Sequence, residues 1–208
     1  TLAANNTTSA INLGTTPVSI LATTAIGGTA TGAISLGAIT LADNVTLTLG
    51  TGIANAINLT SVAGTASGLA SNLTINTTGA VAVSGTIGTD IGTLTITNSG
   101  GTTFSGTVGA TTVTLSNTTG TIAFNGALTA TTLNTAVQAY NLALNASSGT
   151  ITDTVTFSNT GTLTLGASGG TLTFTNGLTA TAPSTKYLSG TLAANNTTSA
   201  INLGTTPV

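Results

Sequence analysis

Threonine alternates with a large aliphatic or aromatic residue in many short stretches of the chain. A period of two places the apolar side chains on one face of an extended strand and the threonines on the other. Thr, Val and Ile are also branched at Cβ, which suits the pleated surface of a sheet. We therefore predict half-buried β-strands along the whole chain. The clearest examples are residues 44–49, 93–97, 112–115, 154–157, 162–165 and 171–175.

Glycine, asparagine and serine separate these stretches at residues 27–28, 98–101, 125–126, 168–170 and 176–177. These residue types tolerate a positive φ angle and are typical of tight turns. Helix signals are nearly absent. Residues 133–144 are the one stretch where a helical turn can be argued, and we prefer a strand there. The pattern predicts an all-β protein with no large helices.

Two arrangements of such strands are open. The Asn-Gly pairs at 125–126 and 176–177 could each close a β-hairpin. Against hairpins, similar segments recur along the chain, as in the stretches that begin at Thr93, Thr112 and Thr162. We therefore favour a parallel β-solenoid (β-helix) with about 17–20 residues per coil.

The aromatic residues support a regular coil. Phe104, Phe124, Tyr140, Phe157 and Phe174 follow one another at nearly equal intervals along the sequence. Equivalent residues of a parallel solenoid lie about 4.8 Å apart along its axis. One aromatic residue per coil predicts a stacked column in the interior. The alternative is a set of aromatic residues scattered through the core.

The first eighteen residues, Thr1 to Val18, are repeated without change as Thr191 to Val208. The duplication indicates a tandem array, with residues 1–190 as one period and residues 191–208 as the start of the next. One period would hold about ten or eleven coils and extend roughly 50 Å. We expect the two copies to occupy the same coil position, with Pro183–Tyr187 just before the joint.

Charged residues make up 2% of the chain, namely Asp43, Asp90, Asp153 and Lys186, and cysteine is absent. Disordered chains combine high net charge with low hydrophobicity, whereas 40% of these residues are hydrophobic, which argues against disorder. No run of about 20 apolar residues predicts a membrane-spanning helix. One lysine cannot build the basic patch that nucleic acids require. The start at Thr1, without a methionine or a signal-like segment, indicates a mature or internal fragment.

The scarcity of charge fits a stacked assembly. A surface with little charge lacks like-charge repulsion and favours association. Columns of identical Thr, Asn or Ser side chains can hydrogen-bond along a solenoid, whereas columns of like charges repel. We therefore expect self-association into a fibre, or continuation of the same repetitive chain, as the main contact of this segment.

Candidate catalytic and metal-binding residues are few. The three aspartates lie far apart in the sequence, without a neighbouring acid or base, so we expect each in a turn. The repeated G-G-x-G-x-D loops of calcium-binding β-rolls are missing. Lys186 could form an isopeptide bond or an ion pair, but we favour an exposed loop around Pro183. We predict no catalytic, cofactor-binding or metal-binding residues, and no enzyme.

Two surface features remain open. The glycosylation motif Asn-x-Ser/Thr occurs at Asn5, Asn6, Asn44, Asn58, Asn72, Asn76, Asn117 and Asn145. Outward Thr-x-Thr pairs at 46/48, 93/95, 112/114, 154/156, 162/164 and 171/173 raise the idea of an ice-binding face. Their uneven spacing argues against it, since such a face needs one pair per coil.

The strands LTITNSGGTTFSGTVG, VTLSNTTGTIAFNG and LTLGASGGTLTFTNG resemble the repeat-rich passenger regions of bacterial autotransporters and haemagglutinin-like adhesins. The resemblance implies a β-solenoid secreted to the cell surface. We therefore expect an extracellular, cell-surface structural repeat unit of a fibre or filament. The alternative is an adhesin, a module that binds glycans or a host or neighbouring cell surface.

Overall fold

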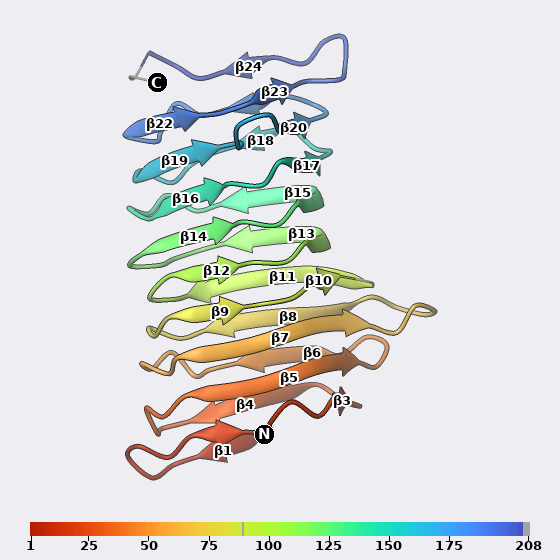
Figure 1. Cartoon of the computed structure of the whole chain (residues 1–208), viewed down its shortest axis with the longest axis vertical. Helices are drawn as coiled ribbons and strands as arrows, with labels where there is room; N and C mark the ends of the chain where they lie inside the picture. The colour runs from red at the N-terminus through yellow and green to blue at the C-terminus, as the bar shows by residue number, and fades with distance from the viewer. Residues whose placement is uncertain (89, 206–208) are drawn as a thin grey trace.

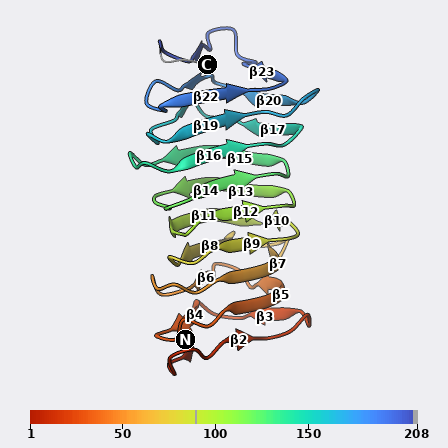
Figure 2. The same ribbon diagram turned by 60° about the vertical axis from the view of Figure 1, so that its left-hand side comes forward.

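The computed structural model describes residues 1–88 and 90–205 of the chain. The chain winds into a stack of coils, with β1 and β24 at opposite ends of the long axis (Figures 1 and 2). The stack makes about ten turns, and none of the described residues forms a helix. Every strand pairing is parallel, and neither Asn-Gly pair closes a hairpin. The prediction of an all-β parallel solenoid is confirmed.

Each turn passes through three ladders of stacked strands, which we name A, B and C in the order in which the chain meets them. Ladder A contains β1 (Leu2–Ala4), β4 (Thr24–Gly28), β6 (Thr46–Leu49), β8 (Ser71–Asn76), β11 (Ile91–Asn98), the last residues of β13 (Val108–Leu115) and β15 (Leu128–Thr135), then β18 (Val155–Thr156), β21 (Leu178–Thr179) and β24 (Ile201–Asn202). Ladder B contains β2 (Ile11–Asn12), the first residues of β5 (Ile34–Leu41) and β7 (Ile57–Gly64), then β9 (Val81–Val83), β12 (Thr102–Phe104), β14 (Thr121–Phe124), β16 (Asn141–Leu144), β19 (Thr162–Leu165) and β22 (Thr185–Leu188). Ladder C contains β3 (Val18–Ile20), the last residues of β5 and β7, β10 (Ile87–Gly88), the first residues of β13 and β15, then β17 (Ser148–Ile151), β20 (Thr171–Phe174) and β23 (Thr191–Ala193).

The coils vary in length. Thr93 has Thr112 as its ladder partner, whereas Thr46 has Asn72, so the second of these turns is several residues longer. The coil length expected from the sequence is therefore too short for most turns. The strands keep their register, while the corners between them take up the additional residues. The number of residues between two similar motifs therefore depends on the lengths of the corners as well as the strands. For this reason it does not give the length of one coil.

The core is built from columns of inward side chains. In ladder B one column runs through Ile34, Ile57, Val81, Thr102, Ile122, Leu142, Leu163 and Lys186. The next inward column runs through Leu36, Leu59, Val83, Phe104, Phe124, Leu144, Leu165 and Leu188. Burial of aliphatic carbon is worth roughly 0.8 kcal/mol per methylene, so the stability of these small side chains accumulates by repetition.

The aromatic residues do not form one column. Phe104 and Phe124 stack in ladder B, with ring centroids 4.8 Å apart and planes 14° from parallel. Phe174 lies in ladder C. Its ring packs edge to face against the ring of Phe157, with the two centroids 5.9 Å apart. The predicted aromatic ladder is therefore correct for one pair and wrong beyond it. The sequence interval does not reveal the ladder in which a residue falls.

Tyr140 lies buried where the chain passes from ladder A to ladder B, and its hydroxyl donates a hydrogen bond to Leu115 O at 3.2 Å. Burial raises its pKa from 10.0 to about 12. The Tyr140 hydroxyl thus ionises near pH 10 in the unfolded chain but stays protonated until about pH 12 in the folded chain. Between these pH values the loss of the proton favours unfolding.

We therefore expect the free energy of unfolding to fall as the pH rises from 10 towards 12. Urea unfolding across this range, compared with Tyr140→Phe, measures the contribution of this hydroxyl. Below pH 10 the free energy of unfolding of the variant should be lower by about 0.5–1.5 kcal/mol, because the variant lacks the hydrogen bond. Above pH 10 its free energy of unfolding should fall less steeply than that of the parent protein. Equal declines in both proteins would contradict the assignment.

Buried polar side chains line the corner between ladders A and B. Asn55, Thr77, Ser99, Thr118 and Asn159 come from five different coils and are all at most 4% exposed. Several of their hydrogen bonds link neighbouring coils, since Thr77 Oγ1 donates to Asn55 O and Thr118 Oγ1 donates to Ser99 O. Asn55 Oδ1 and Asn159 Oδ1, in contrast, are buried without a hydrogen-bond partner among the described residues. The corner is therefore buried with only part of its polar atoms paired.

Glycine is required at the corner between ladders B and C. Gly85, Gly106 and Gly126 follow one another in successive coils, and a Cβ at Gly126 or Gly106 would meet the carbonyl oxygen of the glycine below. The clash is with backbone, which cannot rotate away. The coils can therefore stack at strand spacing here only without side chains.

The two copies of the duplicated segment lie in different ladders. Leu2 pairs with Ile26 in ladder A, whereas Leu192 pairs with Leu172 in ladder C. The expectation that both copies occupy one coil position is therefore wrong, because one period does not make a whole number of turns. Residues 206–208 of the second copy lie outside the described residues.

Candidate functional site

The three aspartates lie at the corner where ladder C leads into ladder A. Asp43 accepts a hydrogen bond from the Thr65 hydroxyl, and Asp153 Oδ2 accepts one from Thr132 Oγ1 at 2.6 Å. Asp90 has a positive φ of 59°. No group of three or more metal-ligating side chains forms among the described residues. All three aspartates thus lie in turns, as expected. Asp43 is bonded to the following coil and Asp153 to the preceding one, whereas Asp90 Oδ2 is buried without a hydrogen-bond partner among the described residues.

Lys186 does not lie in an exposed loop. It belongs to β22, and its side chain is fully buried at the position that Leu163 holds one turn below. Its Nζ donates to Pro183 O at 3.5 Å, and the described residues offer it no ion pair. Our interpretation of this segment as an exposed loop is therefore wrong. The alternation of β22 directs the lysine inward and leaves Tyr187 exposed, while Leu188 at the end of the strand is only partly covered.

Replacement of this buried ammonium group should stabilise the protein. We expect Lys186→Leu to raise the free energy of unfolding by about 1–3 kcal/mol, because a buried charge with one long hydrogen bond is poorly compensated. Lys186→Gln serves as the control, since it removes the charge and keeps a polar end. Denaturant unfolding of the three proteins measures the effect, and a destabilised leucine variant would show that the lysine is better satisfied than its contacts indicate.

Ladder A carries a regular array of outward polar side chains, eight threonines and two asparagines, over five successive coils. One column contains Thr46, Asn72, Thr93, Thr112 and Thr132, and the other contains Thr48, Thr74, Thr95, Thr114 and Asn134. Three of the five coils carry a Thr-x-Thr pair, and the other two have asparagine at one of the two positions. The uneven sequence spacing of these positions arises because the coils differ in length. The pairs at 162/164 and 171/173 lie elsewhere, in ladders B and C. Asn72 links the coils, with Oδ1 accepting from Thr93 N at 3.0 Å.

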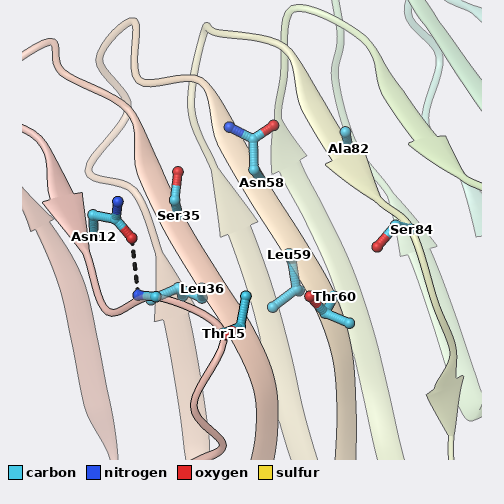
Figure 3. A pocket seen from close by; sticks show the side chains of 10 residues that line it. Asn12, Thr15, Ser35, Leu36, Asn58, Leu59, Thr60, Ala82 and Ser84 are labelled. Carbon is cyan, nitrogen blue, oxygen red and sulfur yellow. Dashed lines mark hydrogen bonds between the residues drawn. The ribbon is translucent and has the colours of Figure 1, made fainter.

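A groove of about 390 Å³ lies over ladder B near the start of the stack, where it continues across β2, β5, β7 and β9 (Figure 3). Asn12, Ser35, Asn58 and Ala82 form one outward column along it. Thr15, Thr60 and Ser84 contribute hydroxyl groups, and Leu36 and Leu59 supply the apolar part. This lining has no charged and no aromatic side chain. It could exchange hydrogen bonds with a neutral ligand but holds no acid, base or nucleophile pair for catalysis.

Of the groove residues the sequence marks only Asn58, as a glycosylation motif, since the alignment of the others depends on the register between β2, β5 and β7. Of the glycosylation motifs, Asn5, Asn6, Asn44, Asn58, Asn117 and Asn145 are exposed, and Asn72 and Asn76 are half-buried. Within residues 1–88 and 90–205, no helix has the length and apolar character needed to cross a membrane.

Comparison with known proteins gives no relative. No protein-family model, curated protein or solved structure matches the chain.

Proposed function

We propose that this chain is a non-catalytic structural repeat unit of a secreted bacterial cell-surface fibre. The observation that carries the proposal is an uninterrupted stack of coils in which the second copy of the duplicated segment extends the ladders of the coil below it. Within the described residues, β1, β2 and β3 pair with strands of the second coil. Their outer edges could therefore pair with the end of an adjoining period.

The backbone groups at these edges can form hydrogen bonds with further strands, and the duplicated segment supplies strands of the same sequence. An open edge in a solenoid must be capped or extended. The sequence that opens the stack, Thr1 to Val18, also follows directly after β22. A tandem chain could therefore continue the same ladders from one period into the next. Between Leu2 and Leu192 the chain makes eight turns and two further ladders, so each period would add about 42 Å to a fibre.

The proposal is tested with chains of one, two and three periods. Electron microscopy should show straight rods that lengthen by about 42 Å per added period. Gold-labelled antibodies against the chain should decorate filaments at the surface of the cells that produce it. Rods joined by flexible linkers, or labelling confined to the cell interior, would refute the proposal.

The groove over β2, β5, β7 and β9 favours a second function, adhesion through neutral glycans. Its amide and hydroxyl groups match the uncharged hydroxyls of sugars, although it lacks an aromatic platform. Binding to a glycan array that is lost in Asn58→Ala, and kept in the outward control Thr74→Ala on ladder A, would favour adhesion. Binding unchanged by Asn58→Ala would exclude the groove as its site.

A further inference from the structure

The two copies of the duplicated segment have the same local conformation. Ser9 N donates to Asn6 O at 2.9 Å, and Ser199 N donates to Asn196 O at 3.0 Å. The next turn is also shared, since Gly14 has a φ of 70° and Gly204 one of 68°. Local structure is therefore set by the eighteen residues themselves. Their place in the stack is set by the coil against which they lie.

The two copies differ by one ladder. The first passes from ladder A to ladder B, with Leu2 on Ile26 and Ile11 on Ile34. The second passes from ladder C to ladder A, with Leu192 on Leu172 and Ile201 on Leu178. One period is eight turns and two ladders, one ladder short of nine turns.

The copies also use opposite edges of the same strand. In the first copy Ile11 N and Leu13 N donate to Ala33 O and Ser35 O of the following coil. In the second, Ala200 O and Asn202 O accept from Leu178 N and Ala180 N of the preceding coil. Alternate residues of a strand point their backbone groups to opposite neighbours. One segment can therefore make both sets of bonds at once, and no backbone group is needed twice.

Side chains add to the contact with the preceding coil. Asn196 Nδ2 donates to Asn176 Oδ1 at 3.0 Å, and Ser199 Oγ donates to Thr175 O at 3.1 Å. The equivalent first-copy residues are Asn6 and Ser9, which have no coil before them in the described residues. The edge formed by β20, β21 and their connection is therefore a surface shaped for this segment.

We propose that successive periods join as one continuous solenoid in which each period is turned by one ladder relative to the one before. The partner of the β20–β21 edge is the first coil of the next period, and this inference rests on the proposed tandem fibre. One turn contains three ladders, and each period is rotated by one ladder. After three periods, or about 125 Å of fibre, a residue therefore lies in the same ladder as its equivalent again. The threonine array of ladder A would then face a different side in each successive period.

The register of the joint is tested in the 208-residue chain with cysteine pairs. Thr179 and Asn202 are ladder neighbours at the joint, so Thr179→Cys/Asn202→Cys should close a disulfide. The control pair is Tyr187→Cys/Asn202→Cys, whose members become neighbours only if both copies share a ladder. We expect the first pair to oxidise at least about tenfold faster, because only its Cα atoms lie within disulfide reach. Faster closure of the control, equal rates, or closure of neither pair would overturn the proposal.

A second measurement does not depend on the variants folding. Cryo-electron microscopy of a three-period chain should give a rise of about 42 Å per period with a rotation of one ladder. The same rise without rotation would contradict the proposed rotation between periods. The two proposals can fail separately, since the cysteine test reports the joint even if no filament occurs at cell surfaces. Filaments whose periods are not rotated relative to one another would support the proposed fibre and refute the proposed rotation.

Discussion

Deletion of residues 104–123 is expected to leave a folded solenoid that is one coil shorter. Phe104 and Phe124 are ladder partners, so joining Thr103 to Phe124 places the phenylalanine over Val83, where Phe104 lay before. Every later strand then meets a partner of its own ladder. Stability in a stack is approximately a sum over coils and their interfaces. The free energy of unfolding should therefore fall by roughly one part in ten, given about ten turns.

A deletion of half that length is the matched control. Removal of residues 104–113 joins Thr103 to Thr114 and would lay a ladder A strand over ladder B. The hydrophobic columns above the junction would then be out of place, and most of the folding free energy should be lost. Circular dichroism and denaturant unfolding of the two variants distinguish the outcomes. Similar behaviour of both would show that these ladders do not set the register.

Phe124→Ala is expected to have the largest effect of a single substitution. The ring is fully buried and stacks on Phe104, with centroids 4.8 Å apart. Neighbouring coils are held at strand spacing by the backbone, so they cannot collapse into the space that the ring leaves. We expect a loss of about 3–5 kcal/mol in the free energy of unfolding, measured by denaturant titration.

Phe124→Leu is the control for this substitution. Leu144 holds the same column one turn further on, so a leucine is known to fit the position. Exchange for a side chain of similar volume should cost less than about 1.5 kcal/mol. A leucine variant as unstable as the alanine variant would mean that the stacked ring pair, rather than the filled volume, matters at this site.

Local patterns predicted the strands well. Thr112–Leu115 and Thr162–Leu165 lie in strands with the expected apolar residues inward, since alternation relates directly to the two faces of a strand. The strand predicted over residues 133–144 is correct for its two ends only, since residues 133–135 and 141–144 are strand and residues 136–140 form the bend between ladders A and B. Even Lys186 obeys the alternation, although Pro183 indicates an exposed loop around it. The strand resumes directly after the proline, and the aliphatic part of the lysine side chain continues the column of Leu163.

Features that depend on corner length could not be predicted. The turn from Thr46 to Asn72 is longer than the turn from Thr93 to Thr112, because corners of different length separate strands of constant register. For this reason the other aromatic residues fell outside the predicted column, and the threonine pairs of ladder A looked irregular in the sequence. No sequence signal shows that the groove residues lie together, because they become neighbours only through that register.

A repetitive, all-β, parallel stack with few charges can be inferred from the amino-acid sequence, because alternation, turn residues and duplication are local properties of the chain. The length of each turn, the ladder that each strand joins and the burial of Lys186 are known only from the folded chain. The same holds for Leu2 and Leu192, which stand at the same position of the duplicated segment but lie in different ladders. Register comes from hydrogen bonds between coils, and a strand pairs with the coil beside it whatever its distance in sequence.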